Sequence, residues 1–189
     1  MFGPKDRTEE IINLIWNRDE YTMYAAGNDA PSKKAVMYVA DTYGVKVPKD
    51  YMAHAIGPWG SPYLEVKEEF WPRHKAGDAG PFWSFLYGLF VYAYSDKAPE
   101  WMQLDVAAKE FKDMGHQVLP ILKIIGDADV YCFNSEGRIV HWSHEEDIFS
   151  PFDGGFFDLL KHEFIELDER RKKKKAEPGG AANAAKPRG

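Results

Sequence analysis

The pattern of apolar and polar residues is clearest in the third quarter of the chain, where it predicts a β-hairpin. Two apolar runs, 118–125 and 129–133, are followed by a four-residue link and a third run, 138–142. The link, 134–137, contains a glycine, and links of this length and type commonly join paired strands. The run 129–133 is apolar at both alternating sets of positions. We therefore expect it to be buried on both faces and to lie centrally in its sheet.

Apolar residues recur at helical spacing in five other stretches, which is typical of helices that bury one face. Several of these stretches begin near a capping residue or a proline and end at a glycine. In the second stretch, Asp29 is expected to cap the helix and Gly44 to end it. The segment 19–29 is open between a continued helix and a loop. The predicted helices span residues 7–18, 31–43, 48–56, 99–115 and 156–168.

Two further strands are predicted, at 63–67 and 83–94, and a long loop is expected between them. Pro120 interrupts an apolar run. Because proline has no N–H to donate, its strand should lie at an edge or carry a bulge there. The order of elements predicts an α+β single domain, a mainly antiparallel sheet with N-terminal helices and a C-terminal helix packed on one side of it. The residues expected to be buried together are Tyr131, Phe133, Val140, Phe157, Leu160 and Phe164.

Charge divides the chain into two parts. With 189 residues, 44% of them hydrophobic, the chain can bury one core. Residues 170–189 hold eight Lys or Arg and one Glu, so residues 1–169 carry 16 Lys or Arg against 29 Asp or Glu, a net charge of −13. We expect 1–169 to be the folded domain and 170–189 to be a basic, disordered tail. The acidic body argues against nucleic acid as a direct ligand and is compatible with a basic protein partner.

The compartment follows from three further observations. There is 1 cysteine, so an internal disulfide is excluded and a reducing compartment is indicated. The first ten residues lack the apolar segment of a signal peptide. The longest uncharged apolar run, 81–95, is shorter than the ~20 residues that span a bilayer. We therefore expect a cytoplasmic protein with no membrane partner.

Candidate catalytic chemistry is sparse. His141, His144 and Glu145 could suggest a metal site, but no HExxH or CxxC motif accompanies them, and the alternative is one histidine in the sheet and one in a solvated turn. Cys132 lies in an apolar strand without an activating neighbour in sequence, which favours an inert buried thiol. There is no GxSxG, P-loop or GxGxxG motif. The sequence predicts no catalytic site, no metal and no cofactor.

Carboxylates cluster at the two ends of the hairpin region and form the candidate partner-binding site. If the strands pair as predicted, the acids before the second run and those after the third emerge at one rim of the sheet. Tryptophans in Gly- and Pro-rich loops could add apolar anchoring beside that rim. The alternative is an ordinary solvated edge that keeps sheets from pairing with one another. The candidate residues are Asp127, Asp129, Glu145, Glu146, Asp147, Trp59 and Trp71.

Three segments carry a family pattern in their order and spacing. They are GVKVPKDYMAHAI (44–56), LPILKIIGDADVYCFNSEGRIVHWSHEED (119–147) and FFDLLKHEF (156–164). Together they resemble the SUKH superfamily of immunity proteins and cell-wall regulators. The resemblance covers residues 35–167, and the helix predicted at 99–115 looks like a lengthened insertion. The residues that match the family pattern are Pro48, Asp50, Tyr51, Leu119, Pro120, Gly126, Asp127, Tyr131, Phe133, Gly137, His144, Glu145, Phe157, Leu159 and Leu160.

The resemblance implies a function for which the residues alone give no motif. Many proteins of this family look like immunity proteins, which neutralise toxins that bacteria deliver to competing cells. Such toxins are often nucleases or nucleic-acid deaminases, and the implied mechanism is stoichiometric binding that occludes the active site. The cognate toxin would then be the basic partner of the acidic body. The alternative is an intracellular scaffold or regulator with the same fold.

Overall fold

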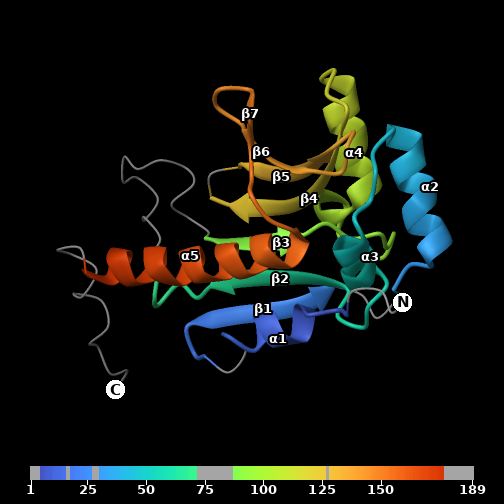
Figure 1. The fold of residues 1–189 in the computed structure, drawn as a ribbon. Coiled ribbons are helices and arrows are strands. Elements are labelled where there is room, and N and C mark those ends of the chain that lie inside the picture. The colour runs from blue at the N-terminus through green and yellow to red at the C-terminus, as the bar shows by residue number, and fades with distance from the viewer. Residues whose placement is uncertain (1–4, 16–17, 27–29, 72–86, 127, 177–189) are drawn as a thin grey trace.

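A seven-stranded antiparallel sheet organises the structure, a computed structural model that describes residues 5–15, 18–26, 30–71, 87–126 and 128–176 (Figure 1). Each strand pairs with the next one along the chain, so the sheet is a meander in which β1 and β7 form the edges. The strands are β1 (Tyr21–Ala26), β2 (Ser61–Val66), β3 (Gly88–Val91), β4 (Val118–Ile125), β5 (Val130–Asn134), β6 (Ile139–Ser143) and β7 (Ile148–Pro151).

Helices cover both faces of the sheet (Figure 1). On one face, the Tyr131 hydroxyl donates to Glu163 Oε1 of the C-terminal helix at 2.7 Å. On the other, Trp142 packs against Phe111 with ring centroids 5.0 Å apart. The expectation that all helices lie on one side is therefore wrong, because both sheet faces are apolar and each needs a cover. The helices are α1 (Thr8–Ile12), α2 (Lys33–Tyr43), α3 (Lys49–Ala55), α4 (Leu104–Asp113), α5 (Phe156–Ala176) and the 3-10 turn η2 (Glu100–Met102).

The predicted hairpin is confirmed as β5 and β6. Val130 pairs with Trp142 and Phe133 with Ile139. Between the strands, Asn134 Oδ1 accepts hydrogen bonds from two backbone N–H groups of its own turn, at 3.0 and 2.9 Å. Residues 130–133 are all buried, as expected for a central strand. The bulge expected at Pro120 is present too, since the β4–β5 register shifts between Pro120 and Leu122.

The predicted core is confirmed except at one position. Five of the six residues are buried, and Phe133 packs edge-on against Tyr51 of α3 with ring centroids 5.0 Å apart. Val140 is the exception. It is half-buried, and because it pairs with Cys132 it lies on the sheet face opposite Phe133. The one-residue alternation along a strand is what places it there.

Three local expectations near the ends of the sheet are wrong. The segment left open between helix and loop contains β1, which pairs along all six of its residues with β2. The first helix ends at Ile12, earlier than predicted, and Ser32 rather than Asp29 caps α2 by accepting from Ala35 N at 3.1 Å. The sequence also gave no sign of β7, which is four residues long and mostly exposed.

The C-terminal helix extends past the predicted domain boundary at residue 169. It runs to Ala176, and Arg171 is 6% exposed, with its guanidinium 3.1 Å from Asp168 Oδ1 and 3.4 Å from Glu20 Oε1. Arg171 therefore belongs to the folded domain, because a basic residue on the inner side of a helix can be buried when it is paired. The helical backbone continues to Ala176. The remainder of the predicted tail, 177–189, lies outside the described residues.

Candidate protein-binding site

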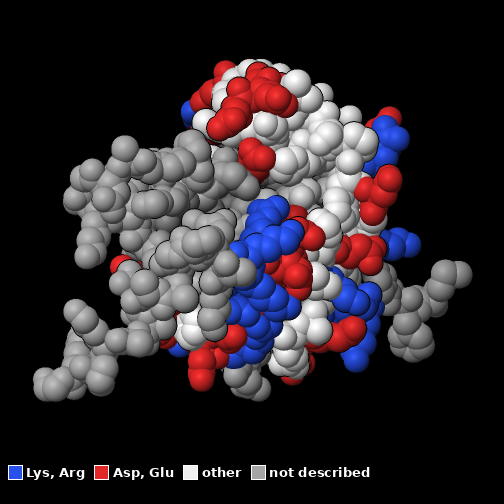
Figure 2. Space-filling model, turned by 90° about the vertical axis from the view of Figure 1, so that its left-hand side faces the viewer, with Lys and Arg blue, Asp and Glu red and all other residues white. Residues whose placement is uncertain are grey.

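The acidic turn, residues 144–147, joins β6 to β7 at the end of the sheet where β5 begins. The backbone N–H of His144 donates to Asp129 Oδ1 at 2.9 Å, so the carboxylates on either side of the hairpin do meet at one rim, as predicted. Figure 2 looks onto this end of the sheet. Acidic side chains gather at its top, where the turn lies, and basic ones gather lower on the same face.

Asp129 is a positioning residue. Its Oδ2 lies 3.2 Å from His141 Nε2, its Oδ1 accepts from the turn, and its side chain is 20% exposed. It therefore ties the acidic turn to the start of β5 and presents little charge outward. Asp127, which was predicted beside it, lies outside the described residues.

Asp147 holds the other end of the turn. Its Oδ1 accepts from Trp142 Nε1 at 2.8 Å and lies 2.9 Å from His116 Nε2. The bond from the Trp142 indole and, more weakly, the one from His116 hold the pKa of this carboxyl below its ordinary value. Asp147 has a φ of 51°, in the left-handed region that aspartate tolerates better than most residues. Its contact with His116, 31 residues away, had no signal in the sequence.

Glu145 and Glu146 are the outward-facing acids of the turn. Both are exposed, and among the described residues neither forms an ion pair. Ile148 follows the turn and is 55% exposed, which places an apolar surface beside the two carboxylates. The turn thus offers two unpaired negative charges on a backbone fixed at both ends.

The two candidate tryptophans lie elsewhere. Trp71 follows β2 at the same end of the sheet, but it stacks on Tyr87 with centroids 4.5 Å apart, and β2 is four strand spacings, ~19 Å, from β6. Trp59 precedes β2 and so lies at the opposite end of the sheet, half-buried against the core. The prediction that both tryptophans lie beside the acidic turn is wrong, because β2 separates Trp59 from Trp71 and puts them at opposite ends of the sheet.

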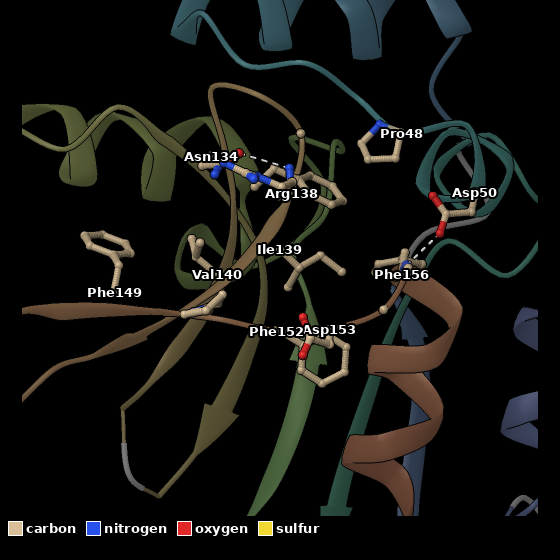
Figure 3. Close-up of a pocket in the computed structure, with 15 residues that line it drawn as sticks. Pro48, Asp50, Asn134, Arg138, Ile139, Val140, Phe149, Phe152, Asp153 and Phe156 are labelled. Carbon is tan, nitrogen blue, oxygen red and sulfur yellow. Dashed lines mark hydrogen bonds between the residues drawn. The ribbon is translucent and has the colours of Figure 1, made fainter.

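A cleft of about 580 Å³ opens at the other end of β6, where α5 and α3 both begin (Figure 3). Its polar side chains are Asp50, Asn134, Arg138 and Asp153. The rest of its lining is apolar or glycine. Sequence patterns gave no sign of this cleft, because its walls come from three segments that only the fold brings together.

Three further findings concern metal binding, the reactivity of the thiol and membrane-spanning helices. Among the described residues, no three His, Cys, Asp or Glu side chains gather in a way that could hold a metal ion, and His141 is paired with Asp129. Burial raises the pKa of the Cys132 thiol well above its ordinary value, which disfavours a thiolate. No helix in the described part of the chain combines the length and apolar character needed to cross a bilayer.

Comparisons with known proteins do not assign a family. No family model matches the chain, and no curated protein matches it.

Proposed function

We propose that this chain is a non-catalytic immunity protein that binds a cognate bacterial toxin and neutralises it by covering its active site. The toxin would be a basic, nucleic-acid-acting protein, such as a nuclease or a deaminase, met in the cytoplasm. The observation that carries the proposal is the acidic turn. It presents Glu145 and Glu146 without ion pairs to described residues, on a backbone held by Asp129 and Asp147.

Electrostatics supports this choice of partner. Residues 1–176, the chain to the end of α5, carry 22 Lys or Arg against 29 Asp or Glu, a net charge of −7. An enzyme that acts on nucleic acid presents Lys and Arg to phosphates. A negatively charged body is attracted to such a groove from a distance, which speeds encounter. Within the complex, carboxylates can take the positions that phosphate groups would occupy.

The rigidity of the acidic turn supports a binding role for it. Ordering a loose loop on binding opposes association, whereas a turn that is already ordered loses little conformational entropy. Side chains of Asp129 and Asp147 bond this turn to the start of β5, to Trp142 and to His116. The exposed Ile148 next to it supplies apolar area of the kind that anchors an interface.

The test uses the protein encoded by the neighbouring gene, because immunity proteins and their toxins are commonly encoded together. Purified full-length chain is added to that protein, and its nuclease or deaminase activity is measured together with the association rate. We expect inhibition that saturates at one chain per toxin and that excess nucleic acid opposes. Association should slow as salt rises, since the Debye length falls to ~10 Å at 0.1 M.

Two double variants separate the acidic turn from overall charge. Glu145→Lys with Glu146→Lys should slow association about tenfold at low salt. Glu68→Lys with Glu69→Lys makes the same change of net charge at two exposed, unpaired glutamates in the turn after β2, and it should stay near wild type. Equal slowing in both variants would show that overall charge, and not the acidic turn, sets the association rate. A complex that forms without inhibiting the enzyme would favour the scaffold alternative.

A further inference from the structure

The cleft at the start of α5 is lined by both polar and apolar side chains. Figure 3 shows Ile139 between Arg138 on one side and Phe152 and Asp153 on the other. The volume of about 580 Å³ is within the ~300–1,000 Å³ typical of ligand pockets. Gly155 allows the starts of α3 and α5 to approach each other closely, because a side chain at this position would collide with the Asp50 carboxylate.

Most polar groups around the cleft already have partners. Asp50 Oδ2 accepts from Phe156 N at 2.6 Å, and its Oδ1 accepts from Tyr51 N at 2.8 Å. Asn134 Oδ1 is taken by the backbone of its turn. The guanidinium of Arg138 is paired with Glu136. These groups build the walls and leave little capacity for a ligand.

Asp153 is different. It is exposed at the mouth of the cleft, and none of the described residues donates to its carboxylate or pairs with it. The lining holds two carboxylates against one guanidinium, and Glu136 balances that guanidinium from outside. Asp50 is bonded to backbone N–H groups at the starts of α3 and α5, where its charge offsets the positive helix ends. The negative charge left without a partner is that of Asp153, and its complement is a cation.

The apolar floor suits the stem of a long cationic side chain. Ile139 is buried beneath the cleft, whereas Phe152 is half-buried and presents part of its surface. Lys and Arg side chains favour such surroundings because their methylene groups bury against apolar atoms while the charged end stays near water. An aromatic ring beside the cation adds a further attraction.

We propose that this cleft binds an arginine or lysine side chain from an extended segment of a basic protein partner. The methylene stem lies over Ile139 and Phe152, and the cation meets the Asp153 carboxylate. The proposal deepens the proposed function, because the identity of the partner as a basic protein rests on it. It adds a contact at the end of β6 opposite the acidic turn, so that a partner lying along the edge strand β7 meets both.

A peptide titration tests the cleft without the partner. The full-length chain is labelled with ¹⁵N, and acetyl-Gly-Arg-Gly-amide is added while backbone amide resonances are followed. We expect saturable shifts at Gly137, Gly154 and Gly155, which line the cleft, with a midpoint of about 1 mM. The matched peptides with Gln or Glu in place of Arg should bind more weakly. Shifts that stay linear up to about 20 mM would overturn the proposal.

Substitutions then identify the group that meets the cation. Asp153→Asn should weaken arginine-peptide binding about fivefold, the change expected for loss of ~1 kcal/mol. The spectrum of the variant itself shows that it is folded. Glu68→Gln removes an exposed charge in the turn after β2, away from the cleft, and should leave the midpoint unchanged. Equal affinity of Asp153→Asn and wild type, or tighter binding of the Glu peptide, would refute the assignment of the cation to Asp153.

The two proposals fail in different ways. If the cleft binds arginine peptide but the reversal of Glu145 and Glu146 leaves toxin association unchanged, the cleft stands and the acidic turn does not. If toxin association depends on the acidic turn while the titration stays linear, the proposed function stands and the cleft proposal falls.

Discussion

Truncation of Phe133 to alanine tests the central strand on which both candidate surfaces depend. Phe133 is 1% exposed in β5, between Leu119 of β4 and Ile139 of β6, both of them buried as well. Its ring packs edge-on against Tyr51, with centroids 5.0 Å apart and an interplanar angle of 76°. The substitution therefore removes a phenyl ring from a site enclosed by two paired strands and a helix.

The size of the effect follows from how little this site can relax. Phe→Ala in a core costs about 3–5 kcal/mol, and an aromatic pair accounts for ~0.5–1.5 kcal/mol of that. Strands hydrogen-bonded on both sides cannot move inward to fill the cavity, so the loss should lie in the upper half, about 4 kcal/mol. That is a large share of the ~5–15 kcal/mol by which domains are usually stable.

Urea unfolding of the wild type and of Phe133→Ala, followed by tryptophan fluorescence, measures this loss. We expect the midpoint to fall with an unchanged slope, which marks a change of stability alone. Phe149→Ala is the matched control: it removes the same ring from the edge strand β7, where Phe149 is half-buried, and should cost about 1 kcal/mol. A loss below 1 kcal/mol for Phe133→Ala would refute the packing described for β5.

Three further predictions concern groups that the fold pairs or buries. Burial opposes ionisation of Asp168, but hydrogen bonds from Arg18 and Tyr21 outweigh it and hold the pKa of this carboxyl well below its ordinary value. Asp168→Asn should therefore cost about 2 kcal/mol in urea unfolding at pH 7, and its difference from wild type should shrink as pH falls below ~3.9, where the unfolded chain takes up the proton. Arg171→Ala should cost about 2 kcal/mol of stability, because it leaves Asp168 with fewer partners. Lys173 is exposed two residues further on, and Lys173→Ala should change stability by less than ~0.5 kcal/mol. Equal effects of the two substitutions would contradict the buried role of Arg171. Burial lowers the pKa of His54 to about 4, so the contribution of this residue to stability is full above pH ~6.5 and is lost as pH falls towards 4. This titration should make the wild type about 2 kcal/mol less stable at pH 5 than at pH 7. Urea midpoints for His54→Gln should show a flatter pH dependence over that range.

The predictions that succeeded rest on short-range patterns. The β5–β6 hairpin was evident from two apolar runs and a glycine-bearing link, and Gly44, with φ of 66°, ends α2 as expected. The bulge at Pro120 follows from one missing N–H. Turn chemistry and apolar alternation act over a few residues, so a single sequence is enough to show them.

The candidate site was predicted only in part. The meeting of the acids at one rim follows from antiparallel pairing, and Asp129 and the turn do meet there. What each acid does was not predictable. Asp129 is held by His141, and Asp147 by Trp142 and His116. These bonds join residues from different elements, and they leave the two glutamates as the exposed charges.

The sequence by itself determined the α+β class, the central hairpin and the acidic character of the body, because composition, periodicity and turn residues are local properties of the chain. Tertiary structure decided the strand state of 21–26, the folded state of Arg171 and the presence of the cleft. In each case a partner distant in sequence settles the outcome: β2 pairs with β1, Asp168 and Glu20 neutralise Arg171, and the starts of α3 and α5 wall the cleft. Such long-range pairings overrule local propensity, since the free energy of a paired strand or a buried ion pair exceeds the small preferences of single residues.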